Sequence, residues 1–121
     1  MGDSHVRQEL LDFALGLPEA WEDHPWGESV AKVGKKVFLF AGVGSGTSLS
    51  ISVKLVESHE QALDFAGALP TGYGLGKSGW VTVPLASAPP AVLRDFVEES
   101  YRIVAPKRAV ALLDASPPAE R

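Results

Sequence analysis

The sequence predicts an α+β fold, with helices toward both ends of the chain and β-strands between them. Toward each end, apolar residues recur three or four positions apart, which is the spacing of an amphipathic helix. From Ser29 to Leu55 they alternate with polar residues instead, as in a half-buried strand. A Gly34-Lys35 pair between two apolar runs is typical of a tight hairpin turn, so two of the strands are expected to pair.

The size and composition are those of one globular domain. At 121 residues, the chain can bury roughly two-thirds of the surface that it exposes when unfolded. Its apolar runs fall far short of the roughly 20 residues that cross a bilayer, and its polar N-terminus lacks the apolar stretch of a secretory signal. Without cysteine to form disulfides, the sequence indicates a cytoplasmic protein with no membrane partner. We expect a single domain over residues 1–113, followed by a flexible tail over 114–121.

The first half of the chain divides into a helix, a loop and three strands. One apolar stripe predicts a helix that Pro18 ends. The stripe consists of Val6, Leu10, Phe13, Ala14 and Leu17. Residues 18–28 combine two prolines with two tryptophans and are interpreted as an ordered loop, and strands are predicted over 30–33 and 36–41. After a connector over 42–47, a strand alternates apolar residues with small hydroxyls and Lys54, so its polar face is expected to be open or lightly covered. The apolar residues of this strand are Leu49, Ile51, Val53 and Leu55.

The second half is predicted to hold two longer helices around one strand. Ser58 and Gln61 form a capping box, which predicts a helix that Pro70 ends. Its inward-facing residues are predicted to be Ala62, Phe65, Ala66 and Leu69. A strand is predicted over 80–83, a long helix from 89–90 to just before Pro106, and a short helix over 108–113.

The charge distribution narrows the class of partner. The net charge of −4 divides unevenly, because residues 1–28 hold seven acids against one arginine, whereas residues 29–56 hold four lysines and no acid. Binding to phosphate without regard to sequence draws on many cations, so a uniformly basic DNA clamp is excluded. A basic face formed by the middle of the chain remains compatible with the sequence.

No motif assembles an enzyme active site. Gly76-Lys77-Ser78 ends like a phosphate-binding loop, but Thr71 stands where that loop needs a glycine, and strand residues follow where it needs a helix. Ser29 and Lys32 match a Ser-x-x-Lys pattern, yet on a strand these two side chains point to opposite faces. The three histidines form no metal-binding pair, and there is no cysteine. We therefore expect no enzyme, no catalytic residue, no metal and no cofactor.

Several short motifs, taken in order, resemble those of the MmcQ/YjbR-like family. The matching segments are Leu17-Pro18, Glu22 to Gly27, Lys32-Val33, Lys36-Val37-Phe38, Ile51 to Lys54, Gly72-Tyr73 with Lys77, Trp80 to Val83 and Glu99-Ser100-Tyr101. The resemblance covers about residues 8–108 and implies an antiparallel β-sheet with helices packed on it, of the double-wing or frataxin-like group, and a DNA-binding role. Frataxin-like relatives also suggest iron, but Glu9 and Asp12 are too few acids on the first helix for a hard cation.

The leading hypothesis is a non-enzymatic binding domain for DNA that uses a basic face. Its contact residues are predicted to be Lys36, Lys54, Lys77, Trp80 and Tyr73. Lysines hold phosphates as point charges without reading sequence, so binding is expected to be weak and salt-dependent. Alternatively, the same residues line a pocket or groove for a small anionic ligand or a protein segment. Trp80 is open to two interpretations, because large aromatic residues of a small domain are core more often than they are stacking platforms.

Overall fold

A computed structural model describes residues 2–25, 28–45, 48–72 and 74–115. Within these ranges six strands form one antiparallel sheet in the order β1-β2-β3-β4-β6-β5, which confirms the predicted α+β class and antiparallel sheet. The strands are β1 (Ala20–Asp23), β2 (Val30–Val33), β3 (Lys36–Ser45), β4 (Ser48–Lys54), β5 (Leu69–Pro70) and β6 (Trp80–Pro84). The helices are α1 (Asp3–Leu15), α2 (His59–Leu63), α3 (Pro90–Val104) and α4 (Lys107–Ala115), with short 3-10 helices η1 (Leu75–Ser78) and η2 (Leu85–Ser87). None of the helices in these ranges has the length and apolar character needed to span a bilayer.

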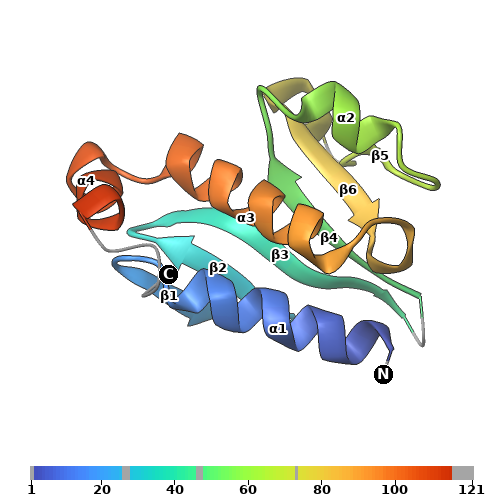
Figure 1. Ribbon diagram of the computed structural model, residues 1–121, viewed down its shortest axis with the longest axis horizontal. Coiled ribbons are helices and arrows are strands. Elements are labelled where there is room, and N and C mark those ends of the chain that lie inside the picture. The colour runs from blue at the N-terminus through green and yellow to red at the C-terminus, as the bar shows by residue number, and fades with distance from the viewer. Residues whose placement is uncertain (1, 26–27, 46–47, 73, 116–121) are drawn as a thin grey trace.

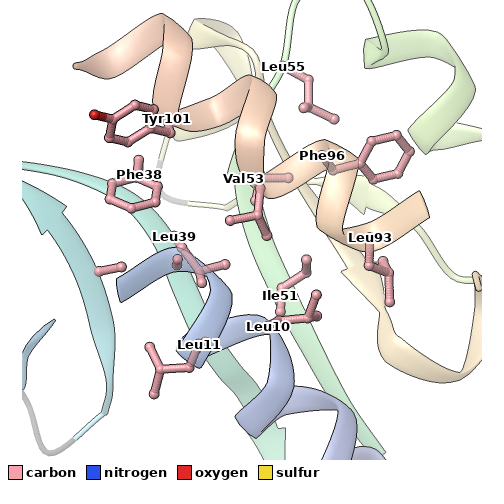
Figure 2. Packing of buried hydrophobic residues seen from close by; sticks show 14 of the residues in the cluster. Leu10, Leu11, Phe38, Leu39, Ile51, Val53, Leu55, Leu93, Phe96 and Tyr101 are labelled. Atoms are coloured by element: carbon pink, nitrogen blue, oxygen red, sulfur yellow. The ribbon is translucent and has the colours of Figure 1, made fainter. Parts of the chain in front are cut away.

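Helices α1 and α3 lie across one face of the sheet and enclose the core (Figure 1). Ile51 and Val53 of β4 are fully buried on this face, as the alternation in the sequence predicts. Figure 2 shows them in one cluster with Leu10 of α1 and Leu93 of α3. Burial of side chains of this size contributes about 1.5–3 kcal/mol each, so this layer is the main source of stability.

A bulge in β3 interrupts the alternation opposite β2. The register shifts between Ala31 and Lys32 of β2, and Phe38 is the additional residue of β3. Phe38 and Leu39 are consequently both fully buried, although they are neighbours in the sequence. The β2–β3 hairpin turns at Gly34, whose φ of 63° is a conformation that glycine adopts without steric cost. The hairpin turn predicted from the sequence is thus confirmed.

The helix predicted after Ser58 is much shorter in the structure. It ends at Leu63, and Leu69 lies instead in edge strand β5, where it is 63% exposed and pairs with Thr82 of β6. The predicted capping box is also wrong, because the Ser58 side chain makes no cap hydrogen bond. Strand pairing with β6 and the positive φ of Gly67, 78°, outweigh the helical pattern of the local sequence.

Three other boundaries differ from the prediction. The segment interpreted as a loop over 18–28 contains β1, because Ala20–Asp23 pairs with β2. The predicted connector over 42–47 is shorter, since β3 continues to Ser45, and residues 46–47 lie outside the described residues. Asp114 and Ala115 belong to α4, not to the predicted tail, and the Asp114 carboxylate lies 2.8 Å from Nη2 of Arg102. The remaining tail residues, 116–121, lie outside the described residues.

Candidate functional site

The face of the sheet opposite α1 and α3, called the opposite face below, carries the polar residues of β4. Because the neighbouring β4 residues Ile51 and Val53 point into the helix-covered core, Ser52 and Lys54 point to the opposite face. Lys54 is in register with Trp80 of β6, so these two side chains lie on the same face of adjacent strands. The sequence-predicted site residues Lys54 and Trp80 are therefore neighbours in the structure.

Lys77 reaches the same end of β4 and β6 through a tight loop. Gly79 has a φ of 94°, and a Cβ built at this glycine would lie 3.9 Å from Lys54 Cγ. The same Cβ would lie only 2.8 Å from the Leu55 carbonyl oxygen, so the loop fits beside β4 only with glycine at this position. The loop carries Lys77, which is exposed, three residues before Trp80, and Gly79 of the same loop lies beside the Lys54 stem. We call Lys54, Lys77 and Trp80 the β4–β6 end.

Trp80 is a packing residue within this group. It is only 7% exposed, and its ring meets Phe40 edge-on with centroids 5.3 Å apart. Such aromatic pairs contribute about 0.5–1.5 kcal/mol beyond the area that they bury. Little ring surface is left for a base to stack on, so Trp80 positions the loop that carries Lys77.

Lys36 lies apart from the β4–β6 end, on the β2–β3 hairpin. It is the first residue of β3, is exposed, and is in register with Val33, whose side chain belongs to the helix-covered core. Lys36 therefore does not share the opposite face with Lys54. Tyr73, the fifth predicted site residue, lies outside the described residues.

Ser100 of α3 marks where β3 and β4 part. The last pair between these strands at this end is Leu39 with Val53. Beyond it, the buried Ser100 hydroxyl donates to the Phe38 carbonyl oxygen and accepts from the Lys54 backbone N–H at 2.9 Å. In Figure 1 the β2–β3 hairpin and the β4–β6 end diverge on either side of α3. The predicted lysines are thus divided between two positions.

The Glu99-Ser100-Tyr101 motif holds the backbone of neighbouring segments. The Tyr101 hydroxyl donates to the Pro18 carbonyl oxygen at 2.9 Å, and burial, together with the charge of Glu19, raises its pKa. Partial burial acts to raise the pKa of Glu99, but hydrogen bonds from Ser58 and from backbone N–H groups of residues 56–58 outweigh it and leave the pKa lowered. Glu99 thus holds the backbone of the segment that leads into α2.

Ion pairing separates the cations of the described residues into two groups. Several bases have a carboxylate partner, among them Lys32 with Asp23 at 2.7 Å and Arg108 with Glu19 at 2.9 Å. Lys32 and the backbone N–H of His24 also hydrogen bond to Asp23 and lower its pKa. The lysines of the two candidate positions have no ion-pair partner in the described part of the chain. These are Lys35, Lys36, Lys54 and Lys77. They are available to bind an anion.

A row of three hydroxyls adjoins the β4–β6 end. Ser52 Oγ lies 2.7 Å from Thr82 Oγ1, which lies 3.0 Å from Thr71 Oγ1. Two hydrogen bonds use two of the three hydroxyl protons, so one hydroxyl retains a proton for another acceptor. Ser52 lies two positions before Lys54 on β4, and Thr82 lies two positions after Trp80 on β6. All four side chains therefore share the opposite face.

Two further exposed residues, Trp21 and Lys35, lie outside the predicted site. Trp21 of β1 is 44% exposed and is in register with Lys32, and Lys35 is exposed at the hairpin turn. The prediction of a loop over 18–28 hides the strand that exposes Trp21, and the prediction of a hairpin turn at Gly34-Lys35 assigns Lys35 no contact role. The alternation of Ala20 to Asp23 is too short to predict a strand, but the indole of Trp21 next to two acids was a usable indication of exposure.

The described residues contain no group suited to a metal ion. No three His, Asp or Glu side chains among them lie close enough to share one. His5 Nε2 lies 2.8 Å from Glu9, and His24 Nε2 lies 3.0 Å from Glu22. These pairs are exposed and support no more than surface ion pairs, which contribute about 0–1 kcal/mol.

A family model described as YjbR matches residues 15–103, which include the hairpin, the β4–β6 end and the Glu99-Ser100-Tyr101 motif. The chain belongs to the YjbR family. This YjbR domain is similar to the crystal structure of Deinococcus radiodurans protein DR2400, which contains the domain DUF419, with 26% identity, a TM-score of 0.68, and coverage of 90% of this chain and 88% of that one. No curated protein matches the sequence.

A second solved structure shares the fold alone. A protein from Pseudomonas syringae, Northeast Structural Genomics Consortium target PsR293, is 21% identical with a TM-score of 0.62. The match covers 81% of this chain and 97% of that one. The YjbR family and its fold are thus established for this chain, and a fold alone does not specify a ligand.

Proposed function

We propose that this YjbR domain is a non-enzymatic, cytoplasmic DNA-binding protein whose lysines 36, 54 and 77 contact phosphates. The observation that carries the proposal is that these lysines have no ion-pair partner in the described ranges, whereas Lys32 and Arg108 are held by carboxylates. A paired cation must give up its partner to bind phosphate. Lys36 and Lys77 are exposed and Lys54 is half-buried, and without a carboxylate partner these lysines lose only water and counterions on binding.

The division of the lysines between two positions favours an extended anion. Lys36 lies on the β2–β3 hairpin, whereas Lys54 and Lys77 lie at the β4–β6 end, across α3 (Figure 1). A nucleic acid backbone carries charge along its whole length and can contact both positions, while a small anion can contact only one. Since lysine side chains are flexible point charges, the contacts hold the backbone without reading its sequence. Trp80 takes part indirectly, by fixing the loop of Lys77.

Fluorescence anisotropy with labelled DNA, titrated from low to physiological salt, tests the proposal. Three phosphate contacts predict a slope of about −2.7 in log affinity against log salt for duplex DNA, because each contact contributes about −0.9. Lys36→Ala/Lys77→Ala should reduce the slope to about −0.9, and adding Lys54→Ala should abolish binding. Because acids outnumber bases in the chain, we expect binding mainly at low salt.

A matched control variant separates local contacts from net charge. Arg94→Ala/Lys107→Ala removes two exposed cations outside the two candidate positions and changes the net charge by the same amount as Lys36→Ala/Lys77→Ala. Its slope should equal that of the unmodified protein. An equal reduction of the salt slope in the two double variants would contradict the proposed contacts. Absence of DNA binding by the unmodified protein even at low salt would contradict them as well.

The second candidate function is binding of a small anion at the β4–β6 end. It is favoured by the hydroxyl row of Ser52, Thr82 and Thr71 beside Lys54, since hydroxyls and an ammonium group are suitable donors to a phosphate oxygen. Titration of inorganic phosphate, followed by the NMR shifts of Thr82 and Lys77, measures this directly. Saturable shifts that Lys36→Ala leaves unchanged would favour the small anion over DNA.

A further inference from the structure

The structure holds Trp21 rigidly while leaving its ring accessible. The indole Nε1 donates to the Gly34 carbonyl oxygen at 2.9 Å, which ties β1 to the turn of the β2–β3 hairpin. The ammonium group of Lys32 lies 5.3 Å from the ring centroid, and Asp23 holds that lysine at 2.7 Å. Although it has these partners, Trp21 is 44% exposed. An exposed aromatic ring that is already immobilised loses little entropy on binding.

The charges around this ring leave a local excess of free cations. Lys35 and Lys36 are exposed and directly follow Gly34, the residue whose carbonyl oxygen accepts the Trp21 hydrogen bond, and they have no ion-pair partner among the described residues. Two of the neighbouring acids are held by cations, Glu19 by Arg108 and Asp23 by Lys32. Glu22 lies 3.0 Å from His24 Nε2, which carries a charge only when it is protonated. Lys35 and Lys36 therefore remain as two cations at this turn against one acid without a permanent cationic partner.

We propose that Trp21 is a stacking platform for a base of single-stranded DNA, with Lys35 and Lys36 contacting its phosphates. This inference rests on the proposed function and specifies the form of DNA bound at the hairpin. Bases in a duplex are already stacked on each other, whereas a single strand can place a base face on an aromatic ring. A protein partner is less suited to the site, because protein interfaces are depleted in lysine. Trp80 does not take this role, since it is 7% exposed.

Anisotropy with three probes of equal length separates stacking from phosphate contact. The probes are a labelled oligo-dT, an abasic oligonucleotide with the same phosphates, and a duplex. The unmodified protein should bind oligo-dT about 5- to 150-fold more tightly than the abasic strand, the range expected for one stacked base. Trp21→Ala should remove this preference and leave abasic and duplex binding unchanged. Lys35→Ala/Lys36→Ala should weaken binding to all three probes.

Two further variants keep the test independent of folding. Trp21→Phe loses the N–H bond to Gly34 but keeps a ring, so it should retain most of the preference for oligo-dT. Trp21→Leu fills similar space without a ring and should lose that preference. Equal affinity of the unmodified protein for oligo-dT and the abasic strand, or a preference that survives in Trp21→Leu, would overturn the stacking role and leave phosphate binding intact. Absence of binding to all three probes would overturn the proposed function itself.

Discussion

The two faces of the sheet differ in what they bury. On the face covered by α1 and α3, the strand residues Ile51, Val53 and Val83 are fully buried and apolar. The opposite face mixes lysines, hydroxyls, aromatic rings and aliphatic residues, and it includes both Ser52, which is 2% exposed, and Trp21, which is 44% exposed. The helix-covered face therefore supplies stability, whereas the opposite face combines residues that pack with residues that can contact a ligand. Residue type alone does not distinguish these two roles on the opposite face.

The two tryptophans of the opposite face show this most clearly. Trp80 begins β6 directly after the Gly79 turn, packs its ring against Phe40 and is only 7% exposed. Trp21 lies on edge strand β1, where only β2 flanks it, and it remains exposed. The position of a strand in the sheet, central or edge, thus decides whether its tryptophan anchors the fold or faces solvent.

The largest expected effect is the difference in stability between these two tryptophans. Trp80→Ala should lower the free energy of unfolding by about 3–5 kcal/mol, because it leaves a cavity beside Phe40. Trp21→Ala should lower it by about 1 kcal/mol, the contribution of one exposed hydrogen bond and partial packing. Urea denaturation followed by circular dichroism measures both. Equal losses in the two variants would show that exposure does not separate their roles.

A somewhat smaller difference in the free energy of unfolding is expected between variants on the two faces of β4. Ile51→Ala removes a fully buried side chain from the helix-covered face and should cost about 2–5 kcal/mol. Ser50→Ala changes the adjacent residue, which points to the opposite face, and should stay within about 0.5 kcal/mol. Chemical denaturation of the two single variants under the same conditions provides the comparison. Similar small losses would mean that the core does not depend on this face of β4.

The regular spacing of apolar residues made most of the fold predictable. The strand with Ile51 and Val53 and the helix Pro90–Val104 follow from local patterns, and both are confirmed. The prediction failed where distant segments decide the structure. β1 exists because it pairs with β2, and β5 because it pairs with β6, although the local sequence of each indicates a loop or a helix.

The candidate site was predictable only in part, for the same reason. Lys54 and Trp80 are cross-strand neighbours, as expected of residues on adjoining strands. The separation of Lys36 from them depends on the bulge at Phe38 and on the Ser100 hydroxyl between β3 and β4, which no local pattern reveals. The exposure of Trp21 likewise depends on the strand order of the complete sheet.

The smallest expected effect concerns pH and the contact from α3 to the start of α2. The Glu99 carboxylate accepts hydrogen bonds from the backbone N–H groups of Val56 at 2.8 Å and Ser58 at 3.3 Å. Burial opposes ionisation, but these bonds and the Ser58 side chain lower the pKa of Glu99 below its ordinary value of 4.5. A pKa that is lowered by folding means that the unfolded chain binds the proton more readily than the folded protein does.

The contribution of Glu99 to stability should accordingly be complete above pH 4.5 and be lost as the pH falls through its lowered folded pKa. Glu99→Gln keeps one acceptor oxygen but no charge, so it should cost about 1 kcal/mol at pH 7 and less at low pH. Urea denaturation of the protein and of this variant between pH 7 and pH 3 measures the difference. Glu60→Gln, which removes the same charge from an exposed position within α2, is the control at each pH. A constant difference between the protein and Glu99→Gln across this range would mean that the ionised carboxylate is not what holds α2 to α3.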